Sequence, residues 1–368
     1  MKLGSFNVEN LFLRARALNG ATFSEGREIL TAHAAINRII GKDHYTAADK
    51  TKMLALLETL GLKKSDESKF AILRQNRGHL VKRPKNGPIQ IVANGRNEWI
   101  GWVDLTLEEV NEVSTRNTAR VLTELNADVQ GIVEAESRPA LVRFCEDVMP
   151  DAGGSRFEHI MLVDGNDERG IDVGLMTRKN FEIASIVSHV DDQDAEGPIF
   201  SRDCAQYEVK TAKGNTLFVL INHFKSKGFG SPAASNAKRK RQAKRTASIY
   251  RELRQHHPFI AIIGDLNDTP DSDPITPLFQ QTGLKEIAEF AGFDDGGRPG
   301  TFKNGTASNK IDYILLSPDL FDKTTAGGIF RMGVWGGTKG TLFPHFPEIT
   351  KEVEAASDHA AIWAELNI

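Results

Sequence analysis

Residues 259–270 read FIAIIGDLNDTP, in which five apolar residues run into Gly264 and then into the polar sequence DLND. An uninterrupted apolar run of this length predicts a strand that is covered on both faces. Asp265 and Asn267 follow at once, where a rigid sheet directs side chains toward an open edge. The stretch therefore predicts a layered α/β protein with a chemical site where its strands end.

Similar apolar runs recur along the chain, and most of them also end in polar residues. We expect further strands at residues 2–6, 129–133, 172–176, 216–221, 311–316 and 360–366. Amphipathic patterns predict helices at residues 115–125 and 236–255, which Asn126-Ala127-Asp128 and His257-Pro258 end. This alternation favours strands buried between helical layers.

The composition is that of an ordinary globular protein, because 40% of the 368 residues are hydrophobic and 26% are charged. The formal net charge of -3 gives no global reason to expect an anionic partner, so any nucleic-acid affinity must come from local patches. Two cysteines, Cys145 and Cys204, exclude a disulfide framework and a cysteine-based zinc site. The sequence has neither a secretory h-region nor an apolar stretch of roughly 18 residues, and we expect a cytoplasmic protein.

Two segments interrupt the alternation and are expected to be insertions into one domain that spans residues 1–368. The first covers about residues 14–110, with helical periodicity at 47–60 and a basic stretch at 63–96 that Pro84 and Pro88 break. The second, about residues 326–356, is rich in Gly, Phe and Pro, and a long loop is expected there.

Six strand boundaries carry acids, amides or imidazoles suited to phosphate chemistry. They are Asn7, Glu134, His223, Asp265 with Asn267, Asp312, and Asp358 with His359. A phosphodiester resists hydrolysis because its negative charge repels the attacking hydroxide. An enzyme for this reaction needs a hard cation, a base for water, donors for the developing charge and an acid for the leaving group.

Oxygen ligands for the cation are available at two of these boundaries. Glu134 and Asp358 are the expected ligands of Mg²⁺ or Mn²⁺, with Asn7 beside them and Glu9 as possible support. The sequence therefore predicts a divalent-metal centre.

The remaining groups fit the proton and charge steps. Asp265 is expected to orient or deprotonate the water, and Asn267 to donate to a phosphate oxygen without adding repulsion. His359, held protonated by Asp312, would stabilise the pentacovalent centre, and His223 would protonate the leaving oxygen.

Each signal also has a purely structural interpretation. A Gly-Asp pair after a strand is most often a turn, Ser-Asp is usually a cap, and a lone His such as His223 is more often a structural residue. Glu134 would then end its strand at the surface, and Asp312 would be a solvated strand residue. The functional interpretation rests on all six boundaries together.

In order along the chain, these motifs resemble the endonuclease/exonuclease/phosphatase superfamily. They are SFNVENL at 5–11, VEAE at 133–136, RGIDVGLMTR at 169–178, NHFKSKG at 222–228, GDLNDTP at 264–270, KIDYILLS at 310–317 and SDHAAI at 357–362. The resemblance implies a four-layer α/β/β/α sandwich, in which two packed mixed β-sheets are flanked by helices, and a Mg²⁺-dependent phosphodiesterase or phosphatase centre.

The resemblance also assigns positions. Asn7 matches the family's first asparagine, Glu134 its metal-binding glutamate, Asp265 and Asn267 its GDxN pair, Asp312 its RIDY-like aspartate, and Asp358 and His359 its terminal SDH pair. His223 stands where deoxyribonuclease-like members have histidine. Val133 replaces the glutamine that usually precedes the glutamate. Asp172 is a weaker assignment, as a residue that orients His223.

Basic residues favour a nucleic-acid substrate, with DNA expected ahead of RNA. They are Lys225, Lys227, Lys238, Arg239, Lys240, Arg241, Lys244, Arg245, Arg251 and Arg254. Lys225 and Lys227 are the expected substrate contacts, whereas the KRKR run is equally compatible with a solvated helix face. Trp99 and Trp102 follow the basic stretch of the first insertion closely and are compatible either with stacking on unpaired bases or with a core.

The leading hypothesis is a divalent-metal-dependent nuclease that uses activated water. One alternative is a phosphatase or phosphodiesterase that acts on a small phosphorylated metabolite or a lipid headgroup, which the aromatic stretch at 334–346 keeps open. Another is a catalytically silent binding module.

Overall fold

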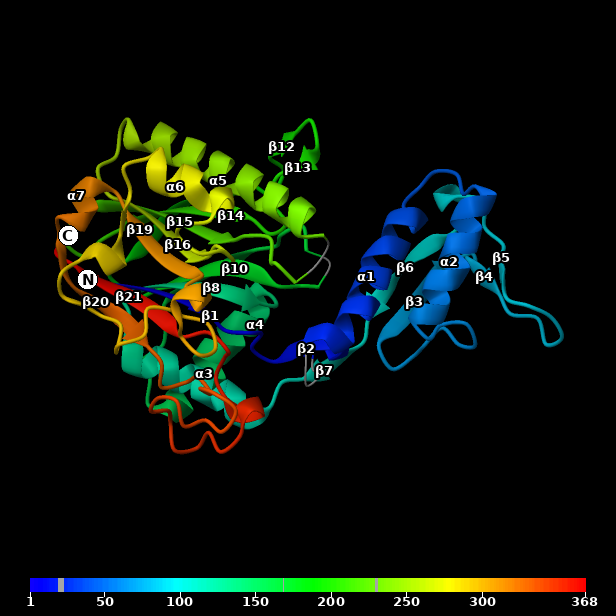
Figure 1. Ribbon diagram of the computed structural model, residues 1–368, viewed down its shortest axis with the longest axis horizontal. Coiled ribbons are helices and arrows are strands. Elements are labelled where there is room, and N and C mark those ends of the chain that lie inside the picture. Colours follow the sequence, from blue (N-terminus) through cyan, green and yellow to red (C-terminus); the bar gives the residue numbers. More distant parts are fainter. Residues whose placement is uncertain (19–22, 168, 229–230) are drawn as a thin grey trace. The chain divides into compact units, whose positions relative to one another are not determined.

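The computed structural model describes residues 1–18, 23–167, 169–228 and 231–368. The chain forms two compact units. The larger unit is built from Met1–Phe12, Val110–Lys227 and Ser231–Ile368, and the smaller from Leu13–Glu109 (Figure 1).

Two mixed β-sheets form the centre of the larger unit. The first sheet has the order β18 (Phe293–Asp294), β20 (Thr324–Phe330), β21 (Ala361–Leu366), β1 (Lys2–Asn7), β8 (Val129–Ala135), β10 (Asp172–Thr177) and β9 (His159–Val163). The second has the order β11 (Glu182–Val187), β14 (Cys204–Lys210), β15 (Thr216–His223), β16 (Ile260–Asp265), β19 (Asp312–Leu316) and β17 (Lys285–Glu286). Every strand expected from an apolar run is present, within a few residues at its ends.

Helices cover the outer faces of both sheets. α3 (Glu112–Leu125) and α4 (Arg138–Arg143) pack on the first sheet, where Leu122 and Leu141 share a core with Phe6. α5 (Pro232–Arg254) and α6 (Thr276–Gln280) cover the second sheet, where Ala247 packs with Leu220 (Figure 1). Together with the apolar layer between the sheets, this arrangement confirms the predicted four-layer α/β/β/α sandwich.

The two sheets approach closely at one glycine in β8. Val129 and Val133 face the core between the sheets, and Gly131 lies between them on the same side of the strand. A Cβ atom at Gly131 would lie 2.4 Å from Ile263 Cδ1 on β16 of the second sheet. The packing of the two sheets therefore depends on the absence of a side chain at residue 131.

Strand register brings the polar strand ends to one edge of the sandwich. β1 runs parallel to β8, with Asn7 opposite Val133, so that Glu134 follows one residue later. In the second sheet, Asp265 lies opposite both His223 of β15 and Asp312 of β19. Residues that are distant in the sequence therefore lie next to one another at the ends of neighbouring strands.

The segment at 326–356 begins as a strand rather than as the expected loop. Its first five residues belong to β20, which pairs with β21. Gly327 and Gly328 suggest a loop from sequence, but a Cβ at Gly327 would lie 2.9 Å from Ile287 Cγ1, so the strand needs glycine there. Further short elements of the larger unit are α7 (Pro318–Phe321), β12 (Gln193–Asp194) and β13 (Gly197–Pro198).

The smaller unit has its own core. It contains β2 (Leu13–Ala15), α1 (Phe23–Ile40), α2 (Ala47–Thr59), β3 (Ala71–Arg77), β4 (Val81–Lys82), β5 (Gln90–Ile91), β6 (Ile100–Leu105) and β7 (Leu107–Glu109). Met53 and Leu57 of α2 pack with Leu73 of β3 and with Trp99, which is a core residue. Thr46 and Asp49 form a capping box that starts α2.

Cys145 and Cys204 are both buried free thiols, in agreement with the absence of a disulfide framework. Among the described residues, no helix combines the length and the apolar character needed to cross a membrane.

Candidate active site

An imidazole and a carboxylate form a buried pair at the edge where the strands end. His359 Nδ1 lies 2.8 Å from Asp312 Oδ2, and Thr301 Oγ1 donates to the same oxygen at 2.5 Å. His359 is 6% exposed and Asp312 3% exposed, so water competes little for these contacts. Burial lowers the pKa of His359, but the carboxylates of Asp312, Asp358 and Asp265 outweigh burial and raise it well above its ordinary value. The ring is therefore an imidazolium at neutral pH.

Asp265 lies beside this pair and is held by the loop that follows β16. His359 Nε2 is 4.0 Å from Asp265 Oδ2. Asn267 donates to Asp265 through its backbone N at 2.8 Å and through Nδ2 at 3.1 Å, and Asn7 Nδ2 lies 3.4 Å from Asp265 Oδ2. Burial and then the charge of Asp312 raise the pKa of Asp265 to about 8.

His223 and Glu134 join Asp265, Asp312 and His359 in a cluster of side chains that spans both sheets. His223 Nε2 lies 3.5 Å from Glu134 Oε1 and 3.7 Å from Asp265 Oδ2. Burial lowers the pKa of His223 well below its ordinary value, and the guanidinium groups of Arg202 and Arg169 lower it further. His223 is therefore neutral where His359 is charged, and its Nδ1 has no hydrogen-bond partner among the described residues.

The C-terminal motif joins the first strand through Ser357. Ser357 Oγ donates to the Asn7 carbonyl at 2.7 Å and accepts from the His359 amide at 3.0 Å. The amide of Asp358 donates to Glu9 Oε2 at 3.1 Å. Burial and then Glu9 raise the pKa of Asp358 to about 7, and Glu134 adds to that rise.

Left-handed backbone occurs at several of these positions. Glu9 has φ 49°, Glu134 φ 67° and Asn267 φ 54°. Such conformations cost about 1 kcal/mol or more in a residue with a side chain and persist where the surrounding structure fixes them. Here they set the directions of the side chains that face the site.

The residues expected to hold a hard divalent cation carry oxygen donors. Glu134, Asp358, Glu9 and Asn7 offer only oxygen ligands, the donor set that Mg²⁺ and Mn²⁺ prefer. Burial raises the pKa of Asp358, and the carboxylates of Glu9 and Glu134 raise it further by a repulsion that a cation would reduce.

A tighter group of possible ligands, formed by Asp265, Asp312 and His359, has ligand atoms that all lie within 4.8 Å of one another. A protonated ring that donates to Asp312 is a poor metal ligand. We therefore treat His359 and Asp312 as a charged pair rather than as metal ligands.

Three residues that sequence reasoning missed form an ion-pair cluster next to His223. Arg169 donates to Asp167 through Nε at 2.8 Å, and Arg202 Nε lies 3.0 Å from Asp167 Oδ2. Arg202 is 2% exposed. RGIDVGLMTR and SRDC contain the two arginines, but nothing in the local pattern links them to Asp167. Thr301 was also missed, because its partner Asp312 is recognisable only in three dimensions.

Asp172 has a different role from the one expected. Its Oδ1 accepts from the Gly165 amide at 2.7 Å. Since His223 Nδ1 has no partner among the described residues and Nε2 faces Glu134 and Asp265, Asp172 does not orient His223. Burial raises the pKa of Asp172 to about 6.

Most of the expected nucleic-acid contacts on α5 have acidic protein partners. Arg239 is 0% exposed and donates to Asp268 at 3.0 Å. The other paired cations of the helix are Lys240 with Asp273, Arg241 with Asp194, Arg245 with Asp192, and Arg254 with Asp319. Their acidic partners are distant in sequence, so the run of basic residues overstates the cationic surface.

The two expected substrate lysines lie just beyond His223. Lys227 Nζ is 2.5 Å from Asp268 Oδ1. Burial, then the charges of Arg202 and Arg169, lower the pKa of Lys225 to about 8.

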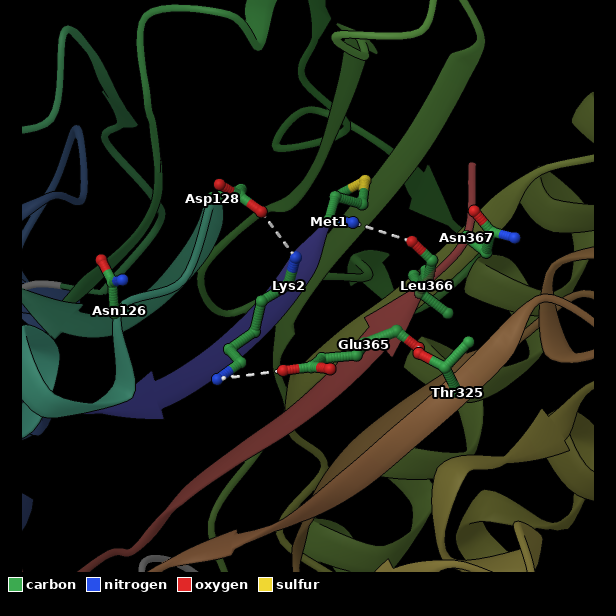
Figure 2. A pocket seen from close by; sticks show the side chains of 8 residues that line it. All are labelled: Met1, Lys2, Asn126, Asp128, Thr325, Glu365, Leu366 and Asn367. Carbon is green, nitrogen blue, oxygen red and sulfur yellow. Dashed lines mark hydrogen bonds and ion pairs between the residues drawn. The ribbon is translucent and has the colours of Figure 1, made fainter.

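A separate pocket of about 420 Å³ lies at the opposite end of β1 from Asn7. It is lined by Met1, Lys2, Asn126, Asp128, Thr325, Glu365, Leu366 and Asn367 (Figure 2). The Lys2 amide donates to Asp128 at 2.7 Å, and Lys2 Nζ pairs with Glu365 at 3.3 Å (Figure 2). The pocket contains none of the residues of the cluster.

Comparisons with known proteins bear on the fold and the family of the chain. Residues 98–325 match the model of a family described as the Endonuclease/Exonuclease/phosphatase family. The fold is similar to a mannosyl-6-phosphatase from Bacteroides thetaiotaomicron, with 17% identity and a TM-score of 0.51 over 70% of this chain and 92% of that chain. An endonuclease/exonuclease/phosphatase family protein from the same organism is similar at 17% identity and a TM-score of 0.51, over 69% and 89% of the two chains.

No curated protein sequence matches the chain. The identities to the solved structures are low, so those two likenesses support the fold alone. The family model, in contrast, spans more than half of the chain and contains Glu134, His223, Asp265 and Asp312. The chain therefore belongs to the endonuclease/exonuclease/phosphatase family.

Proposed function

We propose that this chain is a divalent-metal-dependent nuclease that hydrolyses phosphodiester bonds, with DNA as the first candidate substrate and RNA as the second. The observation that carries the proposal is the convergence of a charged His359, a buried Asp265 and the Glu134–His223 contact. These groups can together bind an anionic phosphorus centre and handle the proton of an attacking water.

Asp265 is the candidate base for that water. In the metal-free protein, burial and the charge of Asp312 raise the pKa of Asp265 to about 8, so this carboxyl group holds a proton more strongly than an ordinary aspartate does. Asn267 and Asn7 hold its oxygens and restrict the direction from which a water can approach.

His359 is the candidate donor to the developing negative charge. Asp312 binds Nδ1, which leaves the proton on Nε2 on the side of Asp358 and Asp265. A fixed cationic donor in a water-poor site is typically worth more than an exposed one.

His223 is better suited to hydrogen bonding as a neutral ring than to acid catalysis. Its pKa lies well below the ordinary value, so few molecules would carry the second proton at neutral pH. The expected role in protonating the leaving oxygen is therefore not part of the proposal.

Glu134 and Asp358, with Asn7 and Glu9, would hold the divalent ion. When bound, the ion supplies Lewis acidity and charge neutralisation at the phosphate. The residues of the protein would then orient the phosphate and the attacking water and accept or donate the protons.

A phosphatase that acts on a small phosphorylated metabolite is the second candidate. The observation in its favour is that most cations of α5 form ion pairs with acidic side chains. These cations are therefore less available to bind the phosphate groups of a long nucleic acid. A lipid headgroup belongs to the same alternative.

Purified protein should be incubated with plasmid, single-stranded DNA, RNA and small phosphate monoesters, in Mg²⁺, Mn²⁺ or EDTA. The proposal expects metal-dependent cleavage of nucleic acid that weakens sharply with added salt. Asp265→Ala and His359→Ala should remove the activity, whereas Asp151→Asn, at an exposed residue of the larger unit, serves as the matched control. Cleavage that survives EDTA, or turnover of monoesters alone, would reject the nuclease assignment.

A further inference from the structure

We propose that the outer face of the β3–β6 pair in the smaller unit binds single-stranded nucleic acid, with Trp102 stacking on an unpaired base. The inference rests on the proposed nuclease function, and it names a substrate-binding surface separate from the catalytic cluster. The face is defined by Arg74 and Arg77 of β3 and by Ile100 and Trp102 of β6.

The charge of the chain is divided unequally between its two units. Leu13–Glu109 contains 16 Lys and Arg against 11 Asp and Glu, a formal charge of +5. Because the whole chain carries -3, the remaining residues carry -8. A polyanion is thus attracted to the smaller unit and repelled on average by the rest of the surface.

Strand alternation places apolar and cationic side chains on one exposed face. Gly101, Val103 and Leu105 of β6 point inward and are buried. On the opposite face, Ile100 is 47% exposed and Trp102 40% exposed. In the strand register, Arg74 lies opposite Trp102, and Arg77 lies opposite Ile100.

Asp104 holds the indole and one guanidinium in fixed positions. Trp102 Nε1 donates to Asp104 Oδ1 at 2.5 Å, and Arg74 Nε donates to Asp104 Oδ2 at 2.9 Å. An aromatic ring fixed in this way loses little conformational entropy when a flat ligand covers it. The carboxylate leaves the face of the indole available for stacking.

Other cations of the unit remain available for phosphate groups. Arg77, Lys82 and Lys85 are exposed and form no ion pair with any residue that the structure describes. Cations beside an exposed aromatic ring are the combination that proteins use to bind single strands, because the ring takes the base and the cations take the backbone.

Trp102 differs from Trp99 in its packing. Trp99 is 1% exposed, belongs to the core of the unit and donates through Nε1 to Tyr45 Oη at 3.0 Å. Trp102 makes no comparable contribution to that core. Duplex DNA, whose bases are already stacked, would not use the exposed ring.

The test is binding of a fluorescein-labelled oligothymidine to the full chain in EDTA, followed by fluorescence anisotropy, so that hydrolysis plays no part. Trp102→Leu should weaken binding about 5- to 100-fold, the effect of losing one base–aromatic stack. Trp102→Phe, which keeps an aromatic face, should restore most of the affinity. Arg77→Gln should reduce the slope of log K against log salt by about 0.7, the value of one single-strand phosphate contact.

Arg116→Gln is the matched control, because Arg116 is a 63% exposed arginine on α3 of the larger unit. It should change neither the affinity nor the salt slope. Equal binding by Trp102→Leu and the unaltered chain would overturn the inference, as would equal affinity for a duplex of the same length. Full displacement of the oligonucleotide by polyglutamate at matched charge would identify an acidic protein as the partner instead and would also overturn it.

The two proposals fail in different ways. Trp102-dependent binding without metal-dependent cleavage would reject the nuclease and keep the binding surface. Metal-dependent cleavage without any effect of Trp102→Leu on binding would reject the surface and keep the nuclease.

Discussion

His359 donates from Nδ1 to Asp312 at 2.8 Å, while its Nε2 lies 3.6 Å from Asp358 Oδ1 and 4.0 Å from Asp265 Oδ2. The Asp312 carboxylate therefore stabilises the charged ring from one side, and two further carboxylates face its other nitrogen. This relationship makes the charge of His359 depend on a residue that need not touch the substrate.

Asp312→Asn should lower the pKa of His359, because it removes the largest of the charges that raise it. Loss of His359⁺ would then limit activity at a lower pH, so the alkaline limb of the pH–rate profile should move to lower pH. His359→Ala should lower kcat by about 10²- to 10³-fold, the usual effect of losing one fixed donor. Steady-state rates between pH 5 and 10 check both expectations, and an unmoved alkaline limb in Asp312→Asn would contradict the first.

In the metal-free protein, Asp265 should reduce stability as pH rises. Its folded pKa of about 8 is above that of an unfolded aspartate, so the folded state binds more protons between pH of about 4 and about 8. The contribution of Asp265 to the free energy of unfolding is therefore largest near pH 4 and is lost as the pH rises toward about 8. The Tm of the unaltered chain minus that of Asp265→Asn, in EDTA, should fall by about 5 °C or more from pH 5 to pH 8.5. A constant difference would contradict the shift.

Glu134→Gln and Asp358→Asn should each weaken Mn²⁺ binding by at least about 10-fold, because each removes a charged oxygen ligand. Titration calorimetry with Mn²⁺ gives the affinity without an activity assay. Asp151→Asn, at an exposed site, should bind Mn²⁺ like the unaltered chain. Unchanged affinity in both ligand variants would place the ion elsewhere.

Arg239→Met should destabilise the fold by about 1.5–3 kcal/mol, because the buried Asp268 loses its partner in α5 and keeps only the ion pair with Lys227. Arg239→Met combined with Asp268→Leu should recover most of that loss. Lys240→Ala breaks an exposed pair and should cost no more than about 1 kcal/mol. Urea unfolding measures all three variants, and equal effects of Arg239→Met and Lys240→Ala would show that burial of the first pair has no energetic consequence.

The sandwich could be predicted because seven of its strands are nearly continuous in apolar residues and most of these end in polar ones. Ile260–Asp265 is the clearest case, since the sequence IAIIGD indicates both the strand and the polar residue that ends it. β11 and β14 could not be predicted in this way, because polar residues interrupt EIASIV and CAQYEVK. β20 could not be predicted in the same way, because Gly327 and Gly328 resemble a loop until the packing of Ile287 is known.

The limits at the site have a similar physical cause. The pairing of Arg239 with Asp268 joins residues 29 positions apart, and that of Arg241 with Asp194 joins residues 47 apart, so a basic run cannot reveal which of its charges are neutralised. Trp99 and Trp102 are three residues apart in one sequence, yet only the first is in the core. Local patterns identify residue types suited to a task, whereas tertiary contacts decide which of them are available.

The absence of a side chain at Gly131 lets β8 and β16 pack closely near the candidate active site. Glu134 follows Gly131 by three residues in one sheet, and Asp265 follows its neighbour Ile263 by two residues in the other. A methyl group at residue 131 would meet the end of the Ile263 side chain, which would have to shift to make room for it. Gly131→Ala is therefore expected to disturb the spacing of β8 and β16 close to Glu134 and Asp265, although it changes no residue of the site itself.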